Sequence, residues 1–281
     1  MSINEKMTAL ADSIREKSGI SGKLSIDEMK IAVDSITTGG GYSIAEALNE
    51  LYAGRTDFKY AMAYNIFIEA PFFDTSNGTI FSYMFYNCLN LQTVPQLDTS
   101  NGTSFNNMFY GCEKLQTVPQ LDTNNGTSFS YMFHDCSNLQ TVPQLDTSNG
   151  TNFSNMFYGC MNLQTVPQFD TSKGRSFNYM FYSCMGLQTV PQLDISNGTN
   201  FSNMFYACFS LKNITFVGII PNTIDFSYAS KLTAESLISI INALKDLTGL
   251  SSKKLYIGST NIAKLTEEQL AIIENKNWTY Q

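Results

Sequence analysis

The chain has 281 residues, with 24 acidic and 17 basic side chains and a formal net charge of −7. This acidic balance argues against a nucleic-acid partner, which needs a basic face to neutralise phosphates. Aromatic residues make up 13% of the chain, which excludes a disordered protein, and a single histidine removes the commonest general base and metal ligand from most sites.

The first residues carry no targeting pattern. Met1-Ser2-Ile3-Asn4-Glu5-Lys6 is not followed by an apolar run, so we expect no signal peptide. No stretch of about 18 apolar residues occurs, so we expect no insertion into a membrane.

Residues 1–38 are predicted to form a helical hairpin. Two apolar series recur at helical spacing, and the capping box Ser25–Glu28 precedes the second. The series are Ile3, Met7, Leu10, Ala11 and Ile14, and then Met29, Val33 and Ile36. The pair is too small to bury much surface alone, so we expect it to dock elsewhere or to join copies of the chain into a homo-oligomer.

Residues 39–73 are predicted to be a linker and an N-terminal cap. Gly39-Gly40-Gly41 is typical of a flexible linker. A second capping box, Ser43–Glu46, begins a helix through Leu51. The stretch 67–74 reads as a degenerate copy of the repeat that follows.

A unit of 24 residues, D-T-S-N-G-T-x-F-x-x-M-F-Y-x-C-x-x-L-Q-T-V-P-Q-L, repeats through the centre of the chain. Six units cover residues 74–97, 98–121, 122–145, 146–169, 170–193 and 194–217. All six cysteines keep this period: Cys88, Cys112, Cys136, Cys160, Cys184 and Cys208. One unit cannot bury its own apolar face, so residues 74–217 are predicted to stack as a solenoid of the α/β repeat class.

Each unit contains two periodicities. Phe81, Met84, Phe85 and Cys88 have the spacing of one stripe on a short helix. Leu91–Val94 reads as a short strand, and equivalent strands are expected to pair in parallel about 4.8 Å apart. Between them, the sequence D-T-S-N-G predicts a turn in which Asp and Asn side chains bond their own backbone and Gly supplies φ > 0.

Residues 218–281 are predicted to be an α/β cap. Thr233 begins a helix whose apolar residues continue to Leu247, and Gly249 ends it. Leu255-Tyr256-Ile257 reads as a short strand. Thr266–Gln269 caps a last helix. Such a cap would cover the open end of the solenoid, which otherwise exposes strand edges and core.

The repeat S-Y-M-F-x-x-C-x-x-L-Q-T-V-P-Q-L-D-T-S-N resembles the BspA-like leucine-rich repeats, also recorded as a mycoplasma-type surface repeat, over about half of the chain. The resemblance implies a leucine-rich-repeat solenoid with parallel strands and a role in surface interactions. Two positions depart from it: Gly102 and its equivalents, where many such repeats carry Val, and Gln96, where an inward aliphatic side chain is common.

Both flanks resemble another group. The segments M-T-A-L-A-D-S-I-R-E-K-S-G-I-S-G-K-L-S-I-D-E-M and K-L-T-A-E-S-L-I-S-I-I-N-A-L-K-D-L-T-G, with the closing N-I-A-K-L-T-E-E-Q-L-A-I-I-E-N-K-N-W-T, are similar to terminal segments of tail-associated proteins of phages and prophages of Gram-positive bacteria. This resemblance implies a virion context.

Three polar columns recur with the period. The cysteines are expected to be buried reduced thiols, with some disulfides as the alternative; a linear column without histidine partners does not suit zinc. The aspartates are expected to accept turn N–H bonds, with a calcium ladder as the alternative. They are Asp74, Asp98, Asp122, Asp146, Asp170 and Asp194. The recurring Asn-Gly-Thr is interpreted as a turn and not as a glycosylation acceptor.

Two further columns are the candidate binding residues. Tyrosines lie beside the apolar stripe and so should face outward at least partly, either to stack between repeats or to bind a partner. They are Tyr83, Tyr86, Tyr110, Tyr131, Tyr158, Tyr179, Tyr182 and Tyr206, with His134 interrupting the series. Glutamines form a polar ladder beside the strands: Gln92, Gln116, Gln140, Gln164 and Gln188.

These features predict a non-enzymatic recognition protein. No base–nucleophile constellation and no glycine-rich phosphate loop occurs, so we expect no catalytic residue, metal or cofactor. The favoured function is a phage or prophage tail protein that contacts a protein or a glycan on the host cell surface. The alternatives are a BspA-like adhesin on a bacterial surface and an enzyme acting on glycans, which would need paired carboxylates across a cleft.

Overall fold

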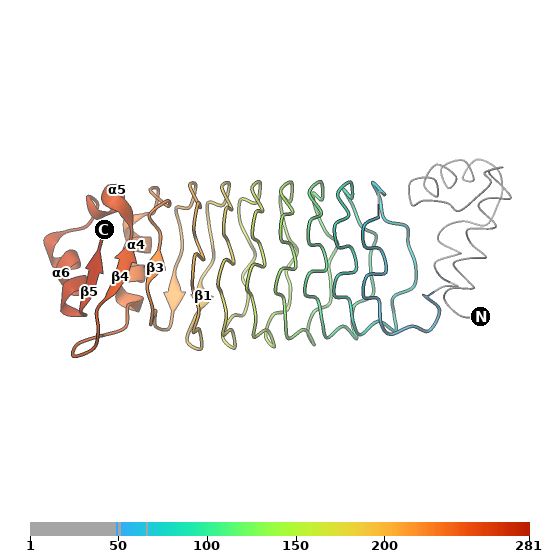
Figure 1. The fold of residues 1–281 in the computed structure, drawn as a ribbon, viewed down its shortest axis with the longest axis horizontal. Coiled ribbons are helices and arrows are strands. Elements are labelled where there is room, and N and C mark those ends of the chain that lie inside the picture. The colour runs from blue at the N-terminus through green and yellow to red at the C-terminus, as the bar shows by residue number, and fades with distance from the viewer. Residues whose placement is uncertain (1–48, 50–51, 66) are drawn as a thin grey trace.

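A computed structural model describes residues 49, 52–65 and 67–281 of the chain. Within these residues the chain winds into a row of similar coils, and a compact unit of helices and strands closes the C-terminal end (Figure 1). The helical hairpin expected over residues 1–38 and the linker after it lie outside the described residues.

The coils stack in parallel, as the repeat predicts. Isolated β-bridges join equivalent positions of successive coils at steps of one repeat: Ile80, Ser104, Ser128, Asn152, Ser176 and Asn200. The expected strands are shorter than predicted. The strand side of the repeats carries single bridges such as Thr165↔Thr189. Pairing extends to two residues where β1 (Leu193–Asp194), at the junction of the fifth and sixth units, pairs in parallel with β2 (Phe216–Val217) at the end of the sixth. A proline in each of the first five units removes one N–H from the ladder, which accounts for these short pairings, whereas the sixth unit has Thr215 at this position.

The prediction of a short helix in each unit is wrong. Residues 81–88 form two consecutive turns, in which Met84 donates its N–H to the Phe81 carbonyl (3.2 Å) and Cys88 donates to the Phe85 carbonyl (3.3 Å). The N–H groups between them point to the next coil instead, as from Phe85 to the Met108 carbonyl at 2.8 Å. A helix would use every N–H within the segment, whereas here alternate N–H groups join neighbouring coils.

Left-handed residues produce these turns. Tyr83 has φ 60° and Asn87 has φ 55°, each at the third position of its turn, and the same two positions keep φ > 0 in the following repeats. A third turn residue with φ > 0 is the geometry of a type II turn. Two other repeats have a glycine, Gly111 or Gly159, at the position of Asn87. Glycine adopts φ > 0 without the steric cost that a side chain brings.

The glycine of the D-T-S-N-G turn has a different role from the one predicted. Gly102 is not among the residues with positive φ. A Cβ atom on Gly102 would instead lie 2.5 Å from Cζ of Phe105 and 2.8 Å from the Thr99 carbonyl. The glycine is therefore required by the close approach of an aromatic ring.

The apolar stripe is buried as predicted, although it is not helical. Phe81, Met84, Phe85 and Cys88 are at most 1% exposed, and their equivalents line one continuous core. The phenylalanine rings stack face to face from coil to coil, as at Phe109–Phe133 (5.5 Å, 4° between planes). The core is a set of parallel side-chain columns along the axis.

Stacking continues beyond the six sequence repeats at both ends. Phe58 stacks on Phe81 at 5.7 Å with 4° between planes, so residues 52–65 take the place of a preceding coil. Phe226 stacks on Phe205 at 5.0 Å with 19° between planes. The aromatic column thus runs from the N-terminal cap into the C-terminal unit.

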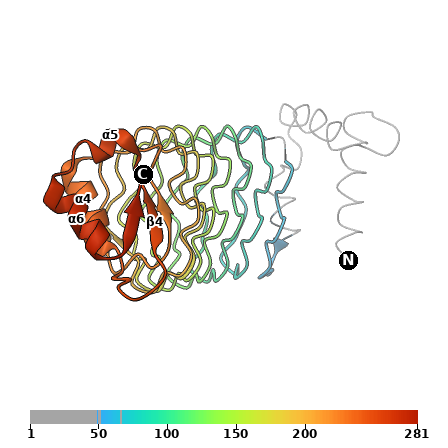
Figure 2. The same ribbon diagram turned by 60° about the vertical axis from the view of Figure 1, so that its left-hand side comes forward.

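The C-terminal unit is α/β, as predicted (Figure 2). A parallel sheet of order β3-β4-β5 packs beside three helices. The elements are β3 (Ile224–Asp225), α4 (Ala234–Ala243), β4 (Lys253–Tyr256), α5 (Gly258–Ile262), α6 (Glu267–Asn275) and β5 (Trp278–Tyr280). Thr233 caps α4 and the Thr266/Gln269 capping box begins α6, as expected, but α4 ends at Ala243, well before Gly249. None of the helices in the described part of the chain has the length and apolar character to cross a membrane.

The six cysteines are free and buried, which confirms the predicted thiol column. Each Sγ donates to a backbone carbonyl of the preceding coil, as Cys136 does to Phe109 at 3.0 Å. Burial raises the pKa of the Cys160 and Cys184 thiols far above the usual range. A thiolate is the reactive form, so we expect no thiol to react with a thiol reagent in the native protein, and all six to react after denaturation. Fewer than six in the denatured sample would reveal a disulfide.

Candidate functional site

A ladder of aromatic rings runs along the turn side of the coils, formed by residues 81–88 and their equivalents. Successive rings are 4.3–4.8 Å apart, and each lies one repeat from the next. The rings of this tyrosine ladder belong to Tyr86, Tyr110, His134, Tyr158, Tyr182 and Tyr206. Most neighbouring rings are nearly parallel, with 2° between the planes of His134 and Tyr158 and 8° between those of Tyr182 and Tyr206.

Stacking within the ladder determines which atoms of each ring are accessible to a partner. Because each ring covers the faces of its neighbours, only ring edges and hydroxyl groups reach solvent. Burial among the other rings raises the pKa of Tyr110 and Tyr158. The repeat-to-repeat stacking expected for these residues is therefore present. What remains for a partner is a line of hydroxyl groups about one coil apart, broken at His134.

His134 occupies a tyrosine position in this ladder and shows no catalytic arrangement. Its ring lies between Tyr110 (4.4 Å) and Tyr158 (4.3 Å), and it is 9% exposed. Nδ1 lies 3.2 Å from Oδ2 of Asp135, but the geometry is not that of a hydrogen bond. The ring fills the packing position that tyrosine holds in the other repeats.

The other candidate tyrosines flank the ladder. Tyr83, Tyr131 and Tyr179 occupy the left-handed position of the first turn, where other repeats carry asparagine. Their rings are tilted against the ladder, with 5.5 Å between Tyr83 and Tyr86 and 5.6 Å between Tyr179 and Tyr182. They widen the aromatic surface in alternate repeats.

The candidate glutamines lie elsewhere. They are half-buried or exposed on the strand side (residues 91–97 and equivalents), so the structure does not bring them together with the tyrosines. Their backbones link coils, as from Gln140 N–H to the Gln116 carbonyl at 3.1 Å. Among their side chains in the described coils, only Gln188 has a hydrogen bond, accepted from Lys212 at 3.2 Å. A binding role for these glutamines stays a prediction.

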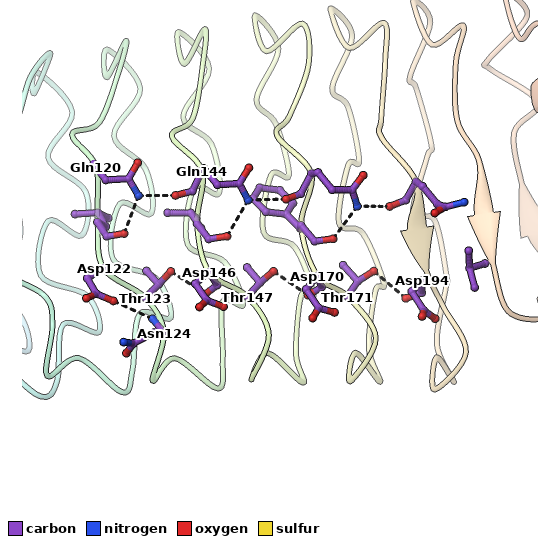
Figure 3. Close-up of a pocket in the computed structure, with 16 residues that line it drawn as sticks. Gln120, Asp122, Thr123, Asn124, Gln144, Asp146, Thr147, Asp170, Thr171 and Asp194 are labelled. Atoms are coloured by element: carbon purple, nitrogen blue, oxygen red, sulfur yellow. Dashed lines mark hydrogen bonds between the residues drawn. The ribbon is translucent and has the colours of Figure 1, made fainter.

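A second glutamine column, formed by Gln96 and its equivalents after the repeat proline, makes a connected ladder. Gln144 Nε2 donates to the Gln168 carbonyl of the next coil at 2.6 Å and to its neighbour Leu145 at 3.2 Å (Figure 3). The same pair of bonds recurs from Gln96, Gln120 and Gln168. These exposed amides tie successive coils together.

The aspartate column forms the turns that were predicted. In every repeat the carboxylate accepts the N–H two residues later, as Asp146 does from Ser148 at 3.0 Å and Asp170 from Ser172 at 3.0 Å. The Ser148 and Ser172 side-chain and backbone bonds lower the pKa of the Asp146 and Asp170 carboxyl groups. Among the described residues, no group of three or more His, Cys, Asp or Glu side chains is arranged to hold a metal ion.

A buried threonine column lies directly behind the aspartates and has no counterpart among the predicted sites. Thr147 Oγ1 donates to the Asp170 carbonyl of the next coil at 2.8 Å, and Thr123 and Thr171 repeat this bond. The turn asparagines also bond between coils and not within their own turn, as Asn101 Nδ2 does to the Ser76 carbonyl at 3.0 Å. Both columns fix the spacing of the aspartates.

A groove of about 960 Å³ runs along the solenoid between the second glutamine column and the aspartates (Figure 3). Its walls are Gln120, Gln144, Gln168 and Gln192 on one side and Asp122, Asp146, Asp170 and Asp194 on the other. Leu121, Leu145 and Phe169 lie beneath the floor and are almost fully buried, and Val217 lies at the C-terminal end.

Comparisons with known proteins bear on the fold and the family. The crystal structure of a leucine-rich repeat protein from T. pallidum matches with a TM-score of 0.36 and 15% identity, over 71% of this chain and 77% of that one. A leucine-rich cell-surface protein from Faecalibacterium prausnitzii matches with a TM-score of 0.28 and 17% identity, over 71% of this chain and 57% of that one. A search of curated proteins gave no match.

The amino-acid sequence of the coils identifies the family. A family model matches residues 47–162 and 127–216, which together exceed half of the chain and include nearly all of the solenoid. The chain therefore belongs to the family described as Mycoplasma protein of unknown function, DUF285.

Proposed function

We propose that this protein is a non-enzymatic recognition protein of the BspA-like adhesin kind, which works at a bacterial surface and binds a protein or a glycan through the turn side of its solenoid. The tyrosine ladder is the observation that carries this proposal. Tyrosine hydroxyl groups recur along the coils on a packed core, with His134 interrupting the series, which suits an extended partner.

The geometry indicates how such a partner would be held. Ring faces are covered by neighbouring rings, so stacking of a sugar on a tyrosine face is excluded within the ladder. The hydroxyl groups can donate and accept hydrogen bonds, and the flanking Tyr131 is 37% exposed. Rigid tyrosines lose little conformational entropy on binding, which favours recognition.

A triple variant separates binding from packing. Tyr110→Phe, Tyr158→Phe and Tyr182→Phe together keep every ring and remove three hydroxyl groups, whereas the Tyr206 hydroxyl is left in place because it accepts a hydrogen bond from Tyr228 at 3.2 Å. We expect an unchanged melting temperature and, on arrays of cell-surface glycans and matrix proteins, about a tenfold loss of binding to the ligands that the native protein retains. Tyr256→Phe, which lies in β4 away from the ladder, is the control and should bind normally. Equal binding by the triple variant would refute the ladder as the binding surface.

A second proposal places the protein in the tail of a phage or prophage, and different residues support it. It rests on the similarity of segments 7–29 and 231–279 to terminal segments of tail-associated proteins, and neither segment falls within the family match over 47–216. In this setting the same solenoid contacts a host cell. Detection of the protein by mass spectrometry in purified phage particles supports this setting, and its absence from them supports the adhesin.

A further inference from the structure

The groove between the second glutamine column and the aspartates has an unusual hydrogen-bonding character. Both amide N–H groups of Gln120, Gln144 and Gln168 are used, one for the following residue and one for the next coil. The hydroxyl groups of Thr123, Thr147 and Thr171 donate to backbone carbonyls. Between its ends, where Asn124 and Gln192 lie, the groove side chains therefore offer only acceptors to a ligand.

The groove is also negatively charged. Four aspartates line it, and its lining includes no Lys, Arg or His. Because the turn bonds lower the pKa of Asp146 and Asp170, these carboxylates stay ionised at neutral pH. Successive coils are about 4.8 Å apart, so the four carboxylates span roughly 14 Å in a line. A matching ligand brings hydrogen-bond donors and positive charge in a linear array.

We propose that this groove docks an extended, lysine-rich segment of a partner protein. An extended chain rises about 3.3 Å per residue, so roughly five residues span the four carboxylates. Lysine ammonium groups supply three donors each, and their flexible stems can adjust to the coil spacing. This docking site lies on the strand side and does not depend on the tyrosine ladder.

One ammonium group of the chain itself acts on these aspartates. Lys173 stands where other repeats have the turn asparagine, and its Nζ donates to Oδ1 of Asn149 at 2.8 Å. Its charge contributes to the lowered pKa of both Asp146 and Asp170. Lys173 is therefore a resident cation that weakens the attraction of the groove for a second one.

The test uses the full chain and a fluorescently labelled peptide in which lysine alternates with serine. In the groove variant, Asp122→Asn, Asp146→Asn and Asp170→Asn remove three charges while the asparagine oxygen keeps each turn bond. In the matched control, Asp74→Asn, Asp225→Asn and Asp246→Asn remove three carboxylates that accept the same kind of turn bond outside the groove. Fluorescence anisotropy at low salt measures the affinity of each protein, and thermal melting confirms that each is folded.

We expect the groove variant to bind about tenfold more weakly than the native chain and the control less than about twofold more weakly. Lys173→Asn, which restores the residue of the other repeats, should bind more tightly. Equal losses in the groove variant and the control would show attraction to net charge alone and overturn the proposal. Binding of spermine with the same dependence on the groove aspartates, without binding of the lysine peptide, would overturn the assignment of a protein segment.

Discussion

Replacing Phe133 with alanine is expected to lower the free energy of unfolding by about 3–5 kcal/mol. The Phe133 ring is fully buried and lies 5.5 Å from the Phe109 ring and 5.6 Å from the Phe157 ring, nearly parallel to both. Each coil of a solenoid contacts only its neighbours, so the cavity weakens two interfaces at once. The backbone bond from Phe133 to the Met156 carbonyl (2.9 Å) remains in the variant.

Urea denaturation of the full chain, followed by circular dichroism, measures this loss as a shift of the midpoint. Thr141→Ala is the matched control because Thr141 is exposed in the same repeat, and a change within about 0.5 kcal/mol is expected there. A loss below about 1 kcal/mol for Phe133→Ala would show that the phenylalanine column does not hold the coils together. A change in the slope of the transition would instead show that the solenoid unfolds in parts.

The sequence correctly identifies which side chains of the repeat face the core but not the backbone that carries them. The spacing of Phe81, Met84, Phe85 and Cys88 is shared by a helix and by two successive turns, because both return a side chain to the same side after three or four residues. What separates them is the direction of the alternate N–H groups, which depends on the neighbouring coil. The residues at the left-handed positions hold a usable indication, since Asn, Asp and Gly recur there and tolerate φ > 0.

Among the polar columns too, a role can be predicted when it depends on residues close in the sequence and not when it depends on the neighbouring coil. The aspartate turns are predictable because the donor lies two residues from the acceptor. Gln144 bonds to Gln168, and its role depends on how the coils are placed against each other. The groove was missed for this reason, although a glutamine after the same proline in successive repeats is a detectable pattern. The Gln92 column pairs between coils through its backbone, and its role in binding stays a prediction.

Replacing Gly150 with valine is expected to destabilise the solenoid by about 3 kcal/mol. A Cβ atom at this position would lie 2.6 Å from Cζ of Phe153 and 2.9 Å from the Thr147 carbonyl oxygen. The ring cannot move aside, because it is stacked between Phe129 (5.9 Å) and Phe177 (5.6 Å). The backbone cannot move easily either, since the Gly150 N–H donates to the same Thr147 carbonyl at 2.7 Å.

A double-mutant cycle with Phe153→Leu identifies which of these two contacts excludes a side chain at Gly150. Phe153→Leu alone removes part of the aromatic column and should be destabilising. In the Gly150→Val background the shorter side chain relieves the contact, so the double variant should be more stable than the sum of the two losses predicts, as measured by urea denaturation. Strict additivity would assign the constraint to the Thr147 carbonyl. The glycine of the D-T-S-N-G turn would then serve the backbone of its own turn, and the aromatic column would not require it.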